Sequence, residues 1–198
     1  MCLKHTEDRI VMNPANLALL TMTKILAIPG SLRANSSSNL VLQSIISSAP
    51  EIVIVEVYND VGVLPHFNDP KQVPSAVTEF RKKVKEADAV LICTPEYAFG
   101  IPGSLKNALD WTVSSGEFID KPVGLVTASS QGEKGHAALL LVLTAISAKI
   151  IDDATLLIPF VRSKLDASGN IKDHDLTNEL KKVVENLSSA ARKKSNVL

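Results

Sequence analysis

The sequence predicts an α/β protein in which a parallel sheet is covered by helices on both faces. Apolar runs alternate five times with segments of helical spacing along the 198 residues. These runs are continuous rather than alternating, which indicates strands buried on both faces. The composition, 45% hydrophobic but only 4% aromatic, is typical of sheets and helices built from Val, Ile, Leu and Ala. The length suits one domain with a substantial core.

The first half of the chain sets this alternation. Residues 24–29 (KILAIP) form an apolar strand, and residues 38–48 repeat apolar side chains at helical spacing. The β-branched run 51–58 predicts a second strand, which a polar loop with Pro and Gly follows at 59–70. Residues 73–87 begin with Pro and Ser and carry apolar side chains on one helical face, so we expect a helix there.

The second half continues it. The fully apolar run 89–94 (AVLICT) predicts a strand buried on both faces, and a proline-rich turn leads into a helix through LKNALDWTV (105–113). The remaining predicted elements are a strand at 122–129, a helix at 136–149, a strand at 154–160 and a closing helix from 173 to about 193. One βα period runs throughout, so we expect a single domain over residues 23–198.

The N-terminal residues 1–22 are predicted to be an extension outside this domain. They contain acids and a proline and lack the basic-then-apolar design of a secretory signal. Met22, directly before the first strand, is an alternative start of the chain.

Charge and cysteine usage exclude several classes of protein. Lys plus Arg equals Asp plus Glu, 21 against 21, so we expect no nucleic-acid or membrane partner. No apolar stretch approaches the roughly 18–20 residues of a membrane span. Cys2 and Cys93 lie far apart, and Cys93 falls inside an apolar run as a small buried hydrophobe. Without a disulfide framework, a reducing and therefore cytoplasmic location is expected.

Ligands of such sheets bind at the carboxyl ends of the strands, where the strand order reverses. Both the Rossmann and the flavodoxin strand orders fit the pattern. In either order, the loops after the first, third and fourth strands are the informative ones.

The first of these loops reads GSLRANSSSN (30–39). It contains neither G-x-G-x-x-G nor the G-x-x-x-x-G-K-[ST] motif of NTP-binding loops. Serine hydroxyls, the Arg33 guanidinium and the start of a helix favour a bound phosphate. The alternative is a serine N-cap with a solvated Arg33.

The other two loops are also unusual in composition. TPEYAFGIPGSLKNALDW (94–111) has two prolines and two glycines, and such a rigid loop with exposed amides suits the polar edge of a planar heterocycle. Its Trp111 is expected in the core. TASSQGEKGHAA (127–138) has small residues and two glycines, which indicate either a close approach to a ligand or a flexible helix entry.

GSLR…S…N together with PEY…PGSLKNALDW resembles the NADPH-dependent FMN reductase family of flavodoxin-like enzymes, in particular its quinone- and chromate-reducing branch. The resemblance covers roughly residues 24–171. It implies a three-layer α/β/α sandwich with strand order 2-1-3-4-5 and a homodimer or homotetramer. It also implies FMN as cofactor and NADPH or NADH as hydride donor to flavin N5. Electrons would then pass to a quinone, azo compound, metal oxyanion or free flavin.

The resemblance also implies which residues surround FMN, and it implies neither a metal nor a catalytic side chain. The phosphate would be held by Ser31, Arg33, Ser36, Ser37, Ser38 and Asn39. The isoalloxazine would be bordered by Pro95, Glu96, Tyr97 and Ala98, and by Ser129, Ser130, Gln131 and Gly132.

The chain departs from the family pattern in three places. One extra residue separates Arg33 from Asn39, Ala98 stands where the family often has Asn, and His136 replaces a glycine of the third loop. His136 is expected to be exposed at a helix start. The alternative function is a flavodoxin-type electron carrier without a nicotinamide site, against which the zero net charge counts.

Overall fold

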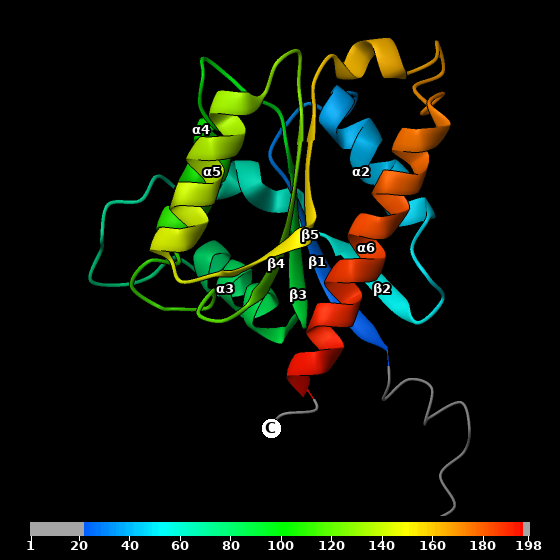
Figure 1. Ribbon diagram of the computed structural model, residues 1–198. Helices are drawn as coiled ribbons and strands as arrows, with labels where there is room; N and C mark the ends of the chain where they lie inside the picture. Colours follow the sequence, from blue (N-terminus) through cyan, green and yellow to red (C-terminus); the bar gives the residue numbers. More distant parts are fainter. Residues whose placement is uncertain (1–21, 196–198) are drawn as a thin grey trace, which may run out of the picture.

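The computed structural model describes residues 22–195 and shows one parallel sheet between two layers of helices (Figure 1). The strand order is β2-β1-β3-β4-β5. The strands are β1 (Thr23–Pro29), β2 (Val53–Val57), β3 (Ala89–Thr94), β4 (Pro122–Ala128) and β5 (Lys149–Ile158). This architecture confirms the predicted fold class and strand order.

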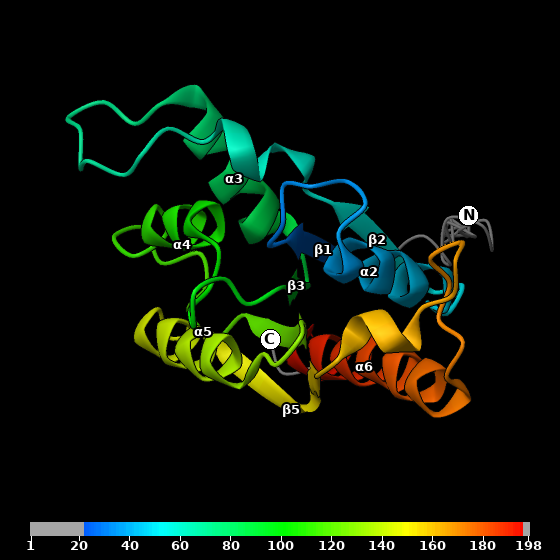
Figure 2. The same ribbon diagram turned by 90° about the horizontal axis from the view of Figure 1, so that it is seen from above.

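The helices divide between the two faces of the sheet. Figure 2 shows α3, α4 and α5 on one side, with α2 and α6 on the other. The helices are α2 (Ser37–Ser47), α3 (Ser75–Glu86), α4 (Gly103–Asp110), α5 (Glu133–Ala145) and α6 (His174–Ser195), with short 3-10 turns η1 (Asn59–Val63) and η2 (Val161–Lys164). None of the helices within residues 22–195 is long and apolar enough to cross a membrane.

Each layer of helices encloses its own part of the core. Phe80 and Leu105 are fully buried on the α3–α5 side, together with Trp111, as the sequence predicts. On the α2 and α6 side, Ile45 and Val184 pack against the opposite face of the sheet. Strands β1, β3 and β4 are apolar on both faces because helices cover both of them.

The predicted element boundaries differ most around α5 and β5. Helix α5 begins at Glu133, because Gly132 before it has a φ of +103°, outside the helical region. It ends at Ala145, two residues before Ser147, whose φ is +59°. Strand β5 begins at Lys149 rather than 154. It is the edge strand of the sheet, so the exposed Asp152 and Asp153 are tolerated within it.

The predicted extension lies outside the described residues, apart from Met22, and so does Cys2. The domain boundary at residue 23 therefore stays a prediction. Strand β1 begins at Thr23 and pairs with β2 from that residue onward, Thr23 with Val53.

Candidate functional site

A cavity of about 510 Å³ opens at the carboxyl edge of the sheet. Four loops line it. The loop after β1 contributes Arg33 and Ser36–Ser38, and the loop after β3 contributes Pro95–Tyr97. The end of β4 and the loop after it contribute Ala128–Ser130, and the turn after β5 contributes Phe160–Ser163. The volume lies within the roughly 300–1,000 Å³ of small-molecule and cofactor sites.

The loop after β1 leads directly into helix α2. Ser36 is the N-cap, and its Oγ accepts a hydrogen bond from the Asn39 amide at 3.2 Å. The Ser36 and Ser38 hydroxyls lie 3.2 Å apart and both residues are buried. No acidic residue occupies the first turn of α2. The positive end of the helix dipole therefore faces the cavity without a countercharge, an arrangement that favours an anion.

Ser31 and Asn39 hold this loop in shape and do not line the cavity. The buried Ser31 Oγ accepts from the Arg33 amide at 3.3 Å and lies 3.3 Å from the Tyr97 hydroxyl. Asn39 Nδ2 donates to the Arg33 carbonyl at 2.9 Å. The contact with Tyr97 ties the first loop to the second.

The loop after β3 is a tight turn clamped at both ends. The Tyr97 and Gly100 amides donate to each other's carbonyls, each at 2.9 Å. Between them, Ala98 and Phe99 have φ values of +50° and +60°. Asn adopts this left-handed region more readily than Ala does, so the Asn that the family often places at position 98 has a backbone reason. Ala98 itself lies outside the cavity lining.

The carboxylate of Glu96 does not point freely into the cavity. Its Oε2 accepts a hydrogen bond from the Gly135 amide at 2.6 Å, at the start of α5. A Cβ on Gly135 would lie 3.1 Å from the Glu96 side chain and from the Gly100 carbonyl oxygen. The glycine at 135 therefore permits the close approach of α5, and Glu96 is a clamp between the second and third loops.

Two of the four residues predicted in the loop after β4 line the cavity. Ser129 and Ser130 line the cavity, and the Ser129 Oγ accepts from the Glu96 amide at 3.3 Å. Gln131 is exposed and Gly132 is buried at the start of α5, and both lie outside the lining.

His136 differs from its expected exposed position. It is half-buried in the first turn of α5, and its Nδ1 lies 2.9 Å from the Thr127 Oγ1. Burial lowers the pKa of His136, because the charged imidazolium is poorly solvated there. His136 does not line the cavity.

Cys93 is fully buried at the end of β3, which confirms the prediction for this residue. Its thiol donates a hydrogen bond to the Ser38 carbonyl at 3.1 Å, and burial raises the pKa of the thiol. The thiol is therefore protonated and unreactive.

The sequence prediction missed the wall after β5, where Phe160, Val161, Arg162 and Ser163 line the cavity. A signal was present, since Arg and Ser directly follow the fifth apolar run at the same sheet edge. The Phe160 and Val161 amides donate to the carbonyls of Ser130 and Ser129, each at 3.1 Å. These bonds bring the β5 wall against the β4 loop.

Charge and shape of the cavity suit an anionic ligand with an apolar part. Arg33 and Arg162 bring two guanidinium groups, and Glu96 is the one carboxylate among the described lining residues. Pro95, Val161 and Phe160 supply apolar surface. The residues present thus fit a phosphate ester with a planar ring system.

The fold and the cavity together define an α/β domain of the flavodoxin-like class with a cavity at the carboxyl edge of its sheet. The family model for NADPH-dependent FMN reductases matches residues 23–162, and the chain belongs to this family. Membership confirms the predicted family, the class of enzyme and the FMN cofactor.

Relatives and solved structures agree with this assignment. An NAD(P)H-dependent FMN reductase of Pseudomonas aeruginosa is 33% identical over 166 residues, 79% of this chain and 88% of that protein. An NADPH:quinone oxidoreductase of Arabidopsis thaliana is 29% identical over 183 residues, 87% of this chain and 93% of that protein. The flavoenzyme NAD(P)H:(acceptor) oxidoreductase FerB of Paracoccus denitrificans superposes with a TM-score of 0.77 at 23% identity, covering 87% of this chain and 98% of FerB. This last likeness supports the fold.

Proposed function

We propose that this chain binds FMN in the cavity at the carboxyl edge of the sheet and uses NADPH or NADH to reduce a small acceptor. The observation that carries the proposal is the convergence of four loops on one cavity with two guanidinium groups, serine hydroxyls and the start of α2. FMN, when bound, supplies the redox chemistry, accepting a hydride from nicotinamide and releasing electrons to the acceptor.

The phosphate of FMN is assigned to the start of α2. Arg33 and Ser37 are the less buried groups there, and the first residues of α2, whose amides have no partner within the helix, belong to the cavity lining. In the pair formed by Ser36 and Ser38 one hydroxyl donates to the other, and the hydroxyl that accepts keeps its own proton for a phosphate oxygen. Ser31 and Asn39 shape the loop from behind.

The ring system is assigned to the loops after β3 and β4. Pro95, Glu96 and Tyr97 line the cavity next to Ser129 and Ser130, since the Glu96 amide donates to the Ser129 Oγ at 3.3 Å. The rigid turn through Ala98 holds the first group, and Gln131 and Gly132 close the second at the start of α5. Glu96 acts here as a positioning residue, because its carboxylate is held by the Gly135 amide.

The acceptor is proposed to be a quinone, an azo compound, a metal oxyanion or free flavin. The relative named for quinone reduction supports a small acceptor of this kind. A cytoplasmic location and a homodimeric or homotetrameric state belong to the same proposal and rest on the family resemblance. Size-exclusion chromatography with light scattering would test the oligomeric state.

Titration of the purified protein with FMN tests the site. Arg33→Ala should weaken FMN binding by about 1.5–3 kcal/mol, the range of a hydrogen bond to a charged group. Lys182→Ala is the matched control, since Lys182 is exposed on α6 outside the cavity lining. An unchanged dissociation constant for the Arg33 variant would refute the phosphate assignment.

Anaerobic mixing with NADPH and with NADH tests the activity. The FMN-loaded protein should lose its flavin absorbance with at least one of the two. If neither bleaches the flavin, the chain is a flavodoxin-type electron carrier and the reductase proposal fails.

A further inference from the structure

We propose that Arg162, on the turn after β5, is a second phosphate-binding cation of this site and acts together with Arg33. The inference rests on the proposed FMN site and deepens it, because it adds a residue from a loop outside the motifs that define the family resemblance. Both arginines line the same cavity although 129 positions separate them in the chain.

The two guanidinium groups in the cavity differ from the other arginines that the structure describes. Arg81 donates to the Trp111 carbonyl, with its Nε at 2.8 Å, and Arg192 donates to the Thr23 hydroxyl at 3.4 Å. The side chains of Arg33 and Arg162 form no hydrogen bond or ion pair with any residue in the described part of the chain. Unpaired guanidinium groups that share a cavity are suited to an external anion.

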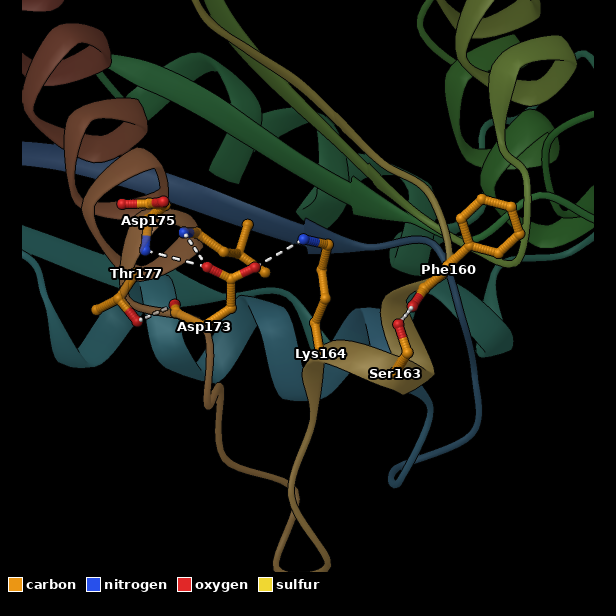
Figure 3. Close-up of polar contacts among 7 residues, drawn as sticks. Phe160, Ser163, Lys164, Asp173, Asp175 and Thr177 are labelled. Atoms are coloured by element: carbon orange, nitrogen blue, oxygen red, sulfur yellow. Dashed lines mark hydrogen bonds and ion pairs between the residues drawn. The ribbon is translucent and has the colours of Figure 1, made fainter.

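The backbone that carries Arg162 is fixed in place. The 3-10 turn η2 is entered through Phe160, whose φ of +53° is a disfavoured, left-handed conformation. Figure 3 shows how the turn is closed, with the Ser163 hydroxyl donating to the Phe160 carbonyl at 2.8 Å. A non-glycine residue stays in such a conformation only where its surroundings determine it, and the amide bonds to Ser129 and Ser130 do so here.

The far end of the turn is tied to helix α6. Lys164 Nζ lies 2.8 Å from Asp173 Oδ2, and Asp173 Oδ1 accepts the amides of Asp175 and Leu176, both at 3.1 Å (Figure 3). Lys164, the next cation along the chain, is thus held in a structural ion pair, whereas Arg162 is not. Because the backbone of Arg162 is already fixed, only its side chain has to be ordered when a ligand binds, which limits the loss of conformational entropy.

The charge of the proposed phosphate ligand is matched by two cations. A phosphate monoester carries about −1.5 to −2 charges at neutral pH, and Arg33 alone supplies one positive charge. The carboxylate of Glu96 is held at the start of α5. Arg33 with Arg162 therefore matches the charge of a single phosphate monoester.

Two phosphates could meet Arg162, that of FMN and those of the nicotinamide nucleotide. The serines at the start of α2 line the same cavity as Arg162, and they favour the FMN phosphate. The two sources predict different results, because riboflavin has the ring system of FMN without its phosphate.

The test compares Arg162→Gln with the wild type in titrations with FMN and with riboflavin. We expect FMN affinity to fall about 10- to 100-fold, the scale of one charge-assisted contact, while riboflavin affinity stays unchanged. Lys172→Gln is the control, since Lys172 is an exposed cation on the same connection between β5 and α6, outside the lining. Arg162 is exposed and unpaired, so the variant should fold, and its circular dichroism and melting temperature check this.

A second variant separates the possible outcomes. Arg33→Gln combined with Arg162→Gln should weaken FMN binding by a factor different from the product of the single effects, because neighbouring groups on one phosphate are coupled.

For Arg162→Gln alone, unchanged FMN affinity with a raised KM for NADPH would place the dinucleotide phosphate at Arg162 and still support a phosphate-binding role. Wild-type FMN affinity and wild-type KM values in Arg162→Gln overturn the inference. If the wild type itself binds no FMN, the proposed function fails instead.

Discussion

Gly30 directly follows β1 and leaves no room for a side chain. Its amide donates to the Cys93 carbonyl at 2.8 Å. A Cβ at this position would lie 2.2 Å from Thr94 Oγ1, 2.5 Å from Thr94 Cβ and 2.9 Å from Thr94 Cα. Rotation of the Thr94 side chain moves only the hydroxyl and the methyl group, so the clash with Cβ and Cα remains. Gly30→Ala must therefore push apart the ends of two adjacent strands.

The size of the effect follows from these distances. Carbon atoms in contact lie about 3.5–4.0 Å apart, so the ends of β1 and β3 must separate by about 1 Å. Overpacking of a core costs about 1–3 kcal/mol and occasionally more, and a clash with buried backbone belongs at the upper end, near 3 kcal/mol. The loop with Arg33 follows Gly30, and Pro95 follows Thr94; both belong to the cavity lining. The same shift should therefore weaken FMN binding as well.

Urea unfolding followed by circular dichroism measures the stability term, and FMN titration measures the binding term. Gly103→Ala is the matched control, because a Cβ there meets nothing within 4 Å and Ala in the first turn of α4 should be neutral or stabilising by up to about 1 kcal/mol. Gly30→Ala combined with Thr94→Gly should recover at least about 1 kcal/mol of the loss, since the two nearest clashing atoms, Thr94 Oγ1 and Cβ, are then removed and only the contact with Cα remains. Wild-type stability and FMN affinity in Gly30→Ala would refute the reasoning.

Two further predictions concern His136 and Trp111, which both lie outside the cavity lining. Burial lowers the pKa of His136 below its ordinary value of 6.5, so the unfolded chain takes up a proton first, and the free energy of unfolding should fall as the pH drops below that value. His136→Asn should flatten this dependence below about pH 6.5; an unchanged slope for His136→Asn would contradict the burial of the imidazole. The one tryptophan, Trp111, donates from Nε1 to the Pro65 carbonyl at 2.7 Å and meets the Phe67 ring edge-on at 5.1 Å. Trp111→Phe should lower the free energy of unfolding, measured with urea, by about 1–3 kcal/mol. A loss below about 0.5 kcal/mol, the size of an ordinary surface substitution, would show that these contacts do not hold the loop with Pro65 and Phe67 in place.

The central strands could be predicted to within one residue because their environment is written locally. β3 and β4 are buried on both faces by helices, so every side chain in them is apolar or small. β5 could not be bounded in this way. It is an edge strand, and Asp152 and Asp153 within it face solvent, so the first half of the strand has the composition of a loop.

The cavity likewise has features that local sequence predicts and features that depend on residues far apart in the chain. Serines, glycines and prolines mark the loops after β1, β3 and β4, and the sequence alone places Arg33 beside a helix start that suits phosphate. The role of Glu96 as a clamp depends on the Gly135 amide, 39 residues away. No local pattern indicates that distance.

The sequence by itself determined the alternation of strands and helices, the family and three of the loops that line the cavity, because burial and turn chemistry act over a few neighbouring residues. Only the tertiary structure decided that the turn after β5 joins these loops. β5 pairs with β4 from Leu125↔Thr155 to Ala128↔Ile158, and the bonds from Phe160 and Val161 to the β4 loop carry that pairing into the cavity. Arg162 therefore shares a cavity with Arg33 through strand pairing, a long-range interaction that residue composition does not record.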